Sequence, residues 1–264
     1  MKMILILVAY HPPADEVERL QACLATLDSE VGYAVVVNDH QPGEPVDRLQ
    51  EGAQLFLTSS HNHGYGRAFN RALAALLALP ERRPQWIGAL NTDLTWLPGT
   101  FERLLAWLQD QSNVVLAVPQ ITDEHGEPAC LCKRDPTLLA LASRRFWPER
   151  LKPTWVRRYD RWYTMQDQDQ DLVLDVPYLS GCCMLMSTES FSKIKGFDER
   201  FFMYLEDADL TRPSSAASDV YKRQVPFASV QHRWARGSHR SFRLTWVTLQ
   251  SAWLYFGIWG LRFW

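Results

Sequence analysis

The sequence has few cysteines, almost no excess charge and no uninterrupted apolar run of membrane-spanning length. Its five cysteines are odd in number and irregularly spaced, which indicates reduced thiols rather than a disulfide framework: Cys23, Cys130, Cys132, Cys182 and Cys183. Cys130 and Cys132 are too close together for a zinc knuckle, and no paired histidines complete such a site. A formal net charge of −2 also excludes a chain that binds nucleic acid through a large positive charge.

The amino-terminal segment MKMILILVAYHPP lacks the small-residue cleavage site of a secretion signal. Its apolar run predicts a buried first strand instead. The missing signal and the reduced thiols together predict a cytoplasmic protein. The 264 residues are 47% hydrophobic and 22% charged, which is typical of a globular chain with enough core to fold without a metal or a disulfide.

Strand and helix patterns alternate through the first half of the chain. Buried strands are predicted from continuous apolar runs at 3–9, 35–37, 54–58, 86–90 and 114–118, and apolar stripes at helical spacing between them predict helices. This alternation predicts a doubly wound α/β sheet with parallel pairing, whose ligands bind beyond the carboxyl ends of the strands. Residues 178–186 predict a further strand, and residues 130–175 predict a variable excursion.

The carboxyl-terminal stretch 244–264 is rich in Trp, Leu and Phe and follows a basic lead-in made of Arg233, Arg236, Arg240 and Arg243. A bilayer needs about 20 apolar residues, and polar residues interrupt this stretch. The pattern favours an amphipathic helix in the plane of a membrane, which predicts peripheral contact with the cytoplasmic face of the inner membrane. A helix that packs on the protein core fits the same pattern.

The segment 214–224, SSAASDVYKRQ, has no apolar periodicity and separates two stretches with folded patterns. Its second part, DVYKRQ, is the translation of the mosaic-end sequence used in transposon-based sequencing libraries. This match predicts an artefact of sequencing or assembly. The alternative is an authentic polar loop.

Two polar clusters follow predicted strands in the first half. Asp39 ends VVVND, where a carboxylate can accept hydrogen bonds from a base or ribose, although turn aspartates are common. Asn62–Asn70, NHGYGRAFN, leads into a helix. Gly64 and Gly66 permit tight turns there, the helix N-terminus suits a diphosphate and Arg67 can bind the same group. A plain strand-to-helix connection is the alternative, since no generic phosphate-loop motif is present.

Two acidic clusters complete the set. Asp93 in the Asn91-Thr92-Asp93 tripeptide can hold Mg²⁺ or Mn²⁺ together with diphosphate oxygens and water. Residues 196–210, GFDERFFMYLEDADL, combine five acids with aromatic residues, and apolar neighbours raise the pKa of a carboxylate and make it a better base. The alternative is an aromatic core with helix-capping acids, a structural role that we expect for Asp198 and Asp209.

The order of these clusters resembles family 2 glycosyltransferases, which are inverting enzymes of the GT-A fold. The family pattern has an Asp after the second strand, then N-x-G-[FY]-[GA]-x-[GA]-x-N, N-x-D, G-F-D-E-x-F-F-x-Y-x-E-D-x-D-L and a late His. The resemblance extends from Met3 to about Phe256, apart from the segment 214–224. The stretches VQHRWARGSHRSF and TWVTLQSAWLYF are similar to the branch of rhamnosyltransferases that builds bacterial surface polysaccharides such as O-antigen.

The resemblance implies a GT-A (Rossmann-like), mostly parallel central sheet flanked by helices, with a C-terminal helical tail. Residues 1–243 would form one domain, with a nucleotide-sugar-binding half at 1–120 and an acceptor and catalytic half at 121–243, and residues 244–264 would form the apolar helix. In the donor site, Tyr10 and Asp39 would line the nucleotide pocket, and Asn62, Gly66 and Arg67 would border it.

For the chemistry, the resemblance implies that Asp93 and the late histidine His232 bind the metal. Asn91 also belongs to the donor site and replaces the first Asp of the commoner D-x-D form. This replacement predicts weak or optional dependence on Mg²⁺ or Mn²⁺. Asp207 would be the catalytic base, and Glu206 would orient the acceptor or share that role.

The sequence therefore predicts transfer of a sugar, with rhamnose from dTDP-rhamnose as the best match, to a glycan or lipid-linked acceptor. Two other classes stay open. A nucleotidyltransferase has a similar sheet but carries a basic Gly-rich loop after the first strand, where this chain has AYHPPADE. An inactive nucleotide-sugar-binding scaffold would lose acids that are present here.

Overall fold

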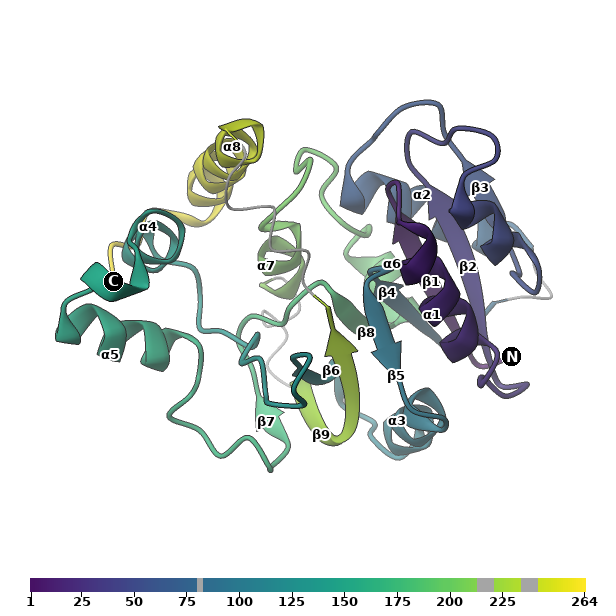
Figure 1. Ribbon diagram of the computed structural model, residues 1–264. Coiled ribbons are helices and arrows are strands. Elements are labelled where there is room, and N and C mark those ends of the chain that lie inside the picture. Colours follow the sequence, from purple (N-terminus) through teal and green to yellow (C-terminus); the bar gives the residue numbers. More distant parts are fainter. Residues whose placement is uncertain (80–82, 213–220, 234–241) are drawn as a thin grey trace.

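The computed structural model describes residues 1–79, 83–212, 221–233 and 242–264 (Figure 1). Within these ranges nine strands form one sheet: β1 (Met3–Ala9), β2 (Val31–Val37), β3 (Phe56–Thr58), β4 (Trp86–Leu90), β5 (Leu94–Trp96), β6 (Val114–Thr122), β7 (Leu174–Asp175), β8 (Cys183–Ser187) and β9 (Tyr221–His232). Their order is β3-β2-β1-β4-β8-β6-β9-β5, and β7 pairs with β9.

Most of these strands point the same way. β1 pairs in parallel with β2 and β4, β2 with β3, and β6 with β9, while β8 runs antiparallel between β4 and β6. β5 and β7 are antiparallel to β9. The mostly parallel sheet is confirmed. The fully parallel pairing expected from the alternating patterns is wrong at β8, which returns against its neighbours after the long excursion from β6.

Helices α1 (Ala14–Leu24) and α3 (Thr100–Gln109) cover one face of the sheet, and α2 (Tyr65–Leu77) and α6 (Thr188–Lys193) cover the other. The chain also forms α4 (Leu138–Phe146), α5 (Thr154–Tyr163), α7 (Glu206–Thr211) and α8 (Phe242–Trp259), of which α4, α5 and α8 lie away from the sheet (Figure 1). Side chains of β1 alternate between two cores, as the period of two in a strand requires. Leu5 and Leu7 pack with α1 and α3, whereas Ile4 and Ile6 pack with α2 and α6. The first strand is buried on both faces, as predicted.

The predicted strands at 3–9 and 86–90 have the bounds of β1 and β4, and the other three predicted runs of the first half overlap β2, β3 and β6. The predicted strand at 178–186 begins only at Cys183, and residues 178–182 form an irregular connection. Of the suspect segment, 214–220 lie outside the described residues, while Tyr221–Gln224 begin β9. The origin of the segment stays a prediction. Arg236 and Arg240 also lie outside the described residues.

The inner face of α8 packs on the segment around α7. Tyr255 and Phe256 share a core with Phe201 and Leu205. The Ser251 hydroxyl donates a hydrogen bond to the Met203 carbonyl at 2.8 Å, and the Trp259 indole N–H donates to Asp209 Oδ1 at 2.8 Å. The core-packing interpretation is thus correct for this face. No helix among the described residues combines the length and apolar character needed to cross a membrane.

Candidate active site

The carboxyl ends of β1 and β2 bring Tyr10 and Asp39 to the same edge of the sheet, since Ala9 and Val37 are paired across the two strands. Between them lies His11, whose Nε2 is 3.2 Å from Asp39 Oδ2 and whose Nδ1 is 2.5 Å from Glu44 Oε1. The hydrogen bond to Glu44 raises the pKa of His11, and Asp39 adds to the effect. Tyr10 is 52% exposed and contacts the His11 ring edge-on. The expected pair is therefore together, with His11 as a neighbour that the sequence analysis missed.

The Asn62–Asn70 loop packs directly against the segment 196–210, although the two are far apart in the sequence. Gly64 has a φ of +83°, and a Cβ there would lie 2.2 Å from the Phe202 carbonyl oxygen. A Cβ on Gly66 would lie 2.8 Å from Phe197 Cβ. The Asn70 amide donates to the Phe197 carbonyl at 2.8 Å. Glycine is needed at both positions because the chain packs closely against Phe197 and Phe202. From the sequence, these glycines were expected to form a tight turn for a phosphate instead.

Asn62 and Arg67 make local contacts at the same junction. Asn62 Oδ1 accepts the Gly64 N–H at 2.9 Å, which fixes the turn before α2. Arg67 Nε donates to Glu199 Oε2 at 3.1 Å, and both side chains remain almost half exposed. Arg67 is therefore paired with a carboxylate of the acidic motif, and its contact with the donor stays a prediction.

Asp93 and His232 meet because β5 pairs antiparallel with β9, with Leu94 opposite His232. His232 Nε2 lies 2.9 Å from Asp93 Oδ2. Asp93 Oδ1 is buried and has no hydrogen-bond partner among the described residues. A buried carboxylate oxygen that lacks a hydrogen-bond partner is suited to bind a divalent cation. No group of three His, Cys, Asp or Glu side chains suitable for a metal occurs in the described parts of the chain, so diphosphate oxygens would have to complete the shell.

The pKa of His232 distinguishes the Asp93–His232 pair from an ordinary surface contact. Burial lowers the pKa of His232, but hydrogen bonds to Asp93 and Cys182 outweigh burial and raise it to about 9. A further acid, which was not predicted from the sequence, is Glu16 in the first turn of α1. Burial raises the pKa of Glu16, its hydrogen bond to Thr92 lowers it, and the nearby charge of Asp93 raises it further. A second carboxylate next to the metal candidate adds negative charge that Asn91 does not supply.

Asp207, in the first turn of α7, has both carboxylate oxygens held by the connection before β8. Tyr178 donates its hydroxyl proton to Oδ1 at 2.9 Å, and the Gly181 N–H donates to Oδ2 at 2.9 Å. Gly181 leaves little space, because a Cβ there would lie 3.0 Å from Asp207 Cβ. Tyr65 supports this connection by donating to the Gly181 carbonyl at 3.1 Å. Oδ1 also accepts the Ala208 N–H at 2.9 Å, so the carboxylate has one fixed orientation and Oδ2 is the oxygen that keeps a lone pair for another donor.

The neighbouring acid, Glu206, has a different environment. It is 8% exposed, and its Oε2 has no hydrogen-bond partner among the described residues. Burial, together with the negative charge of Asp207, raises the pKa of Glu206 to about 8. Glu206 therefore keeps its proton at neutral pH. The pKa increase expected for an acid of this motif is found at Glu206.

The connection 178–182 joins the two acidic clusters. Gly181 holds Asp207, while the thiol of the next residue, Cys182, is close enough to His232 to raise the pKa of the imidazole. The Cys182 carbonyl also accepts the Asn91 N–H at 2.9 Å. Residues from β4, β9 and α7 are thus brought together through two consecutive residues. The arrangement can supply a cation site for a diphosphate and a carboxylate that removes a proton.

The two remaining acids of the motif have structural contacts, as predicted. Asp198 binds the Arg200 guanidinium, with Oδ2 2.9 Å from Nε, and Asp209 accepts the Trp259 indole N–H.

This sheet, with its acidic site at the carboxyl ends of parallel strands, defines a glycosyltransferase of the GT-A fold. A family model described as glycosyl transferase family 2 matches residues 15–195. The chain belongs to this family.

A curated relative present in two strains of Mycobacterium tuberculosis is named N-acetylglucosaminyl-diphospho-decaprenol L-rhamnosyltransferase. It is 29% identical over 248 residues, which cover 89% of this chain and 77% of the relative. The chain is thus similar to a rhamnosyltransferase, which agrees with the branch expected from the sequence.

Solved structures agree on the fold at 12–15% identity. GalNAc-T7 with UDP, GalNAc and Mn²⁺ has a TM-score of 0.61, covering 89% of this chain but only 44% of that one. The mannosyltransferase PcManGT from Pyrobaculum calidifontis, in complex with GDP-Man and Mn²⁺, has a TM-score of 0.57, covering 97% and 75%. Residues 1–349 of S. aureus TarS with UDP-GlcNAc give 0.58, covering 97% and 67%.

Proposed function

We propose that this chain is an inverting rhamnosyltransferase that transfers rhamnose from dTDP-rhamnose to a lipid-linked glycan acceptor during synthesis of a bacterial surface polysaccharide. The name of the mycobacterial relative supports the donor sugar and the lipid-linked acceptor. The observation that carries the proposal is the connection 178–182, since it links the Asp207 carboxylate to the Asp93–His232 pair. With such an acceptor, the enzyme works at the cytoplasmic face of the membrane.

Asp207 is the base in the proposed reaction. Its carboxylate takes the proton of the acceptor hydroxyl while that oxygen forms a bond to the anomeric carbon of the sugar, and the bond from this carbon to the diphosphate oxygen breaks. A single displacement inverts the configuration. A nucleoside diphosphate is a good leaving group, so no separate acid is needed, in contrast to hydrolysis by paired carboxylates.

Asp93 and His232 would hold Mg²⁺ or Mn²⁺ against the donor diphosphate, where the cation neutralises the charge that develops on the leaving group. Tyr10 and Asp39 contact the nucleoside, and Asn62, Gly66, Arg67 and Asn91 form the edge of the donor site. Because only two protein side chains serve as ligands, the metal dependence is weak.

Glu206 acts as a neutral carboxylic acid next to the base. A protonated carboxyl donates a hydrogen bond, so Glu206 can orient the acceptor oxygen toward Asp207. Its proton also prevents two adjacent negative charges in a buried site.

The Asp207→Asn variant tests the proposal, since it keeps the size of the side chain and removes the base. We expect transfer to fall by at least about a hundredfold while dTDP-rhamnose still stabilises the protein in a thermal-shift assay. Asp198→Asn is the matched control, because its carboxylate binds Arg200 outside the proposed site. Rapid turnover by the Asp207→Asn variant would refute the assignment of the base.

A donor screen by thermal shift tests the substrate with dTDP-rhamnose, UDP-glucose, UDP-galactose and GDP-mannose, each with Mg²⁺ or Mn²⁺. Selective stabilisation by dTDP-rhamnose is the expected result. Stabilisation by another donor would replace rhamnose in the proposal. A folded protein that binds these donors without transferring sugar would favour the scaffold, and nucleotide transfer to a sugar phosphate would favour the nucleotidyltransferase.

A further inference from the structure

The outer face of α8 is apolar and open to solvent. Phe242, Trp246, Leu249 and Trp253 follow one another at intervals of four, three and four residues, so they lie on one stripe of the helix. They are 94%, 63%, 47% and 85% exposed, respectively. A helix of a globular protein normally turns its apolar stripe toward the core. Here α8 has a buried inner face and a second, uncovered apolar face.

The excursion that contains α4 and α5 has a similar surface with a strong positive charge. Its exposed apolar side chains are Phe146, Trp147, Leu151, Trp155 and Trp162. Residues 138–163 contain seven Lys and Arg residues and two acids, a net charge of 7 − 2 = +5, whereas the whole chain has −2. Exposed tryptophans among arginines are typical of protein surfaces at a membrane interface.

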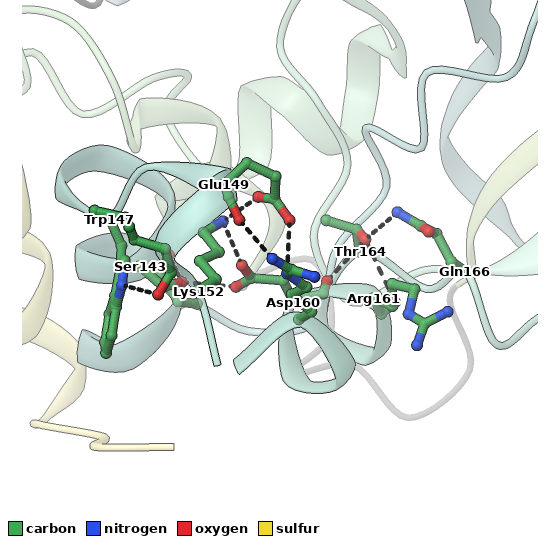
Figure 2. A network of polar contacts seen from close by, with 11 residues as sticks. Ser143, Trp147, Glu149, Lys152, Asp160, Arg161, Thr164 and Gln166 are labelled. Carbon is green, nitrogen blue, oxygen red and sulfur yellow. Dashed lines mark hydrogen bonds and ion pairs between the residues drawn. The ribbon is translucent and has the colours of Figure 1, made fainter. Parts of the chain in front are cut away.

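The two acids of residues 138–163, Glu149 and Asp160, are both bound to one buried lysine, Lys152 (Figure 2). Lys152 Nζ lies 2.9 Å from Glu149 Oε2 and 2.6 Å from Asp160 Oδ2, and the Ser143 hydroxyl donates to Asp160 Oδ1 at 2.6 Å. Neither Arg158 nor Arg161 has a carboxylate partner among the described residues. Arg157 is paired with Glu149 at 3.8 Å, so Arg158 and Arg161 are the arginines of α5 whose charge can meet a ligand outside the protein.

A groove of about 620 Å³ opens among these charges. Arg144, Arg157 and Arg161 contribute to its lining, together with Lys152 and its two carboxylate partners. Two of its lining residues, Thr154 and Arg161, are next in the sequence to the exposed Trp155 and Trp162 of α5. Arginine binds phosphate oxygens through a planar fork of donors, and the combined site fits a lipid headgroup together with the upper part of its acyl chains.

The two surfaces belong to one end of the molecule. The Leu138 and Leu139 N–H groups of α4 donate to the carbonyls of Arg262 and Phe263 at 2.9 and 3.0 Å, and Arg145 donates to the Thr245 hydroxyl on α8 at 2.5 Å. Figure 1 shows α4, α5 and α8 grouped at the end of the molecule away from α1 and α2. The α8 stripe and the α4–α5 surface are together called the docking face below.

We propose that the docking face binds the surface of a bilayer that contains anionic lipids. The aromatic side chains enter the headgroup region, and the arginines bind lipid phosphates. Because the inner face of α8 is hydrogen-bonded to Met203 and Asp209, this binding holds Asp207 close to the membrane surface, where the lipid-linked acceptor of the proposed function lies. That last step rests on the proposed function, whereas membrane binding itself does not.

Sedimentation of the full chain with vesicles tests the proposal. We expect binding to vesicles of phosphatidylcholine with about 30% phosphatidylglycerol at about 0.1 M salt, and weaker binding both to pure phosphatidylcholine and at about 0.5 M salt, because salt screens surface charges. Absence of binding to the anionic vesicles would overturn the proposal.

Two pairs of substitutions separate the contribution of the apolar α8 stripe to vesicle binding from that of the α5 arginines. Trp246→Ser with Trp253→Ser removes the apolar stripe, and Arg158→Glu with Arg161→Glu reverses charge on α5. Each pair should weaken binding to anionic vesicles by about thirtyfold or more. Leu97→Ser, at a side chain that is 71% exposed before α3, and Arg71→Glu, on the exposed side of α2, are matched controls and should bind like the wild type.

Two further outcomes separate this proposal from its alternatives. If Trp246→Ser with Trp253→Ser converts a stable dimer in solution to a monomer, the α8 stripe is an interface between copies of the chain, and the membrane proposal is wrong. Donor stabilisation in the thermal-shift assay should be the same in the wild type and in all variants. If donor binding or Asp207-dependent transfer fails while vesicle binding follows the expected pattern, only the proposed function is refuted.

Discussion

Glu206→Gln should make the protein more stable at neutral and alkaline pH. The wild-type side chain is buried next to Asp207, and its pKa is about 8 instead of the ordinary 4.5. The folded state therefore keeps a proton that the unfolded state releases above pH 4.5. Since the folded state binds more protons, the stability contributed by Glu206 falls as pH rises from about 4.5 to about 8.

The size of the effect follows from the same two pKa values. From pH 4.5 to pH 7 is 2.5 pH units, and each unit corresponds to roughly 1.4 kcal/mol, so the wild type loses about 3 kcal/mol through this group by pH 7. The glutamine of the variant would stay neutral at every pH and would avoid this loss. The two proteins should therefore have similar stabilities at about pH 4.5, and the variant should be more stable by a few kcal/mol at about pH 7.

Guanidinium unfolding of both proteins at several pH values measures this difference. Glu18→Gln, at an exposed position of α1, is the matched control, and its difference from the wild type should change much less with pH. Parallel pH profiles of the wild type and the Glu206→Gln variant would refute the assignment of a protonated, buried Glu206.

Two further predictions concern the contacts around the site. Gly64→Ala should reduce the free energy of unfolding by about 2–4 kcal/mol, because its positive φ and the Phe202 carbonyl both oppose a Cβ. The control is Gly126→Ala, with φ +83° and nothing within 4 Å of the added Cβ, which should cost only about 1 kcal/mol. Equal losses for the two variants in guanidinium unfolding would contradict the packing argument. Tyr178→Phe should lower kcat for transfer by about ten- to hundredfold without changing donor affinity, since it removes the hydroxyl that fixes Asp207; an unchanged kcat would exclude Tyr178 as a positioning residue.

Much of the first half of the fold was predictable because its strands are buried on both faces. Such strands are continuous apolar runs, as at Met3–Ala9 and Trp86–Leu90, and they need no long-range information. β9 was missed because its burial depends on its neighbours. Lys222 is buried there through hydrogen bonds to the carbonyls of Pro177 and Thr211, which the local sequence does not indicate.

The site residues that belong to recognisable sequence motifs were predictable from the sequence. Asp93 and His232 are joined by the pairing of β5 with β9, and the order of the motifs anticipated this contact. The role of residues 178–182 was missed because their apolar residues resemble the β8 strand that follows. His11 and Glu16 were missed because each lies in a short polar stretch whose neighbours come from other strands.

The connection 178–182 also determines which part of the chain can vary. Asp207 and His232 are separated in the sequence by most of β9 and by the residues that precede it, yet they approach two consecutive residues: Gly181 donates to Asp207, and Cys182 lies near enough to His232 to raise its pKa. In the excursion before this connection, Lys133 pairs with Tyr178 and β7 pairs with β9, so these contacts must be kept, whereas the residues between them can change in length or composition without moving Asp207 relative to Asp93 and His232. Such an arrangement allows a common transfer site to be combined with different acceptors.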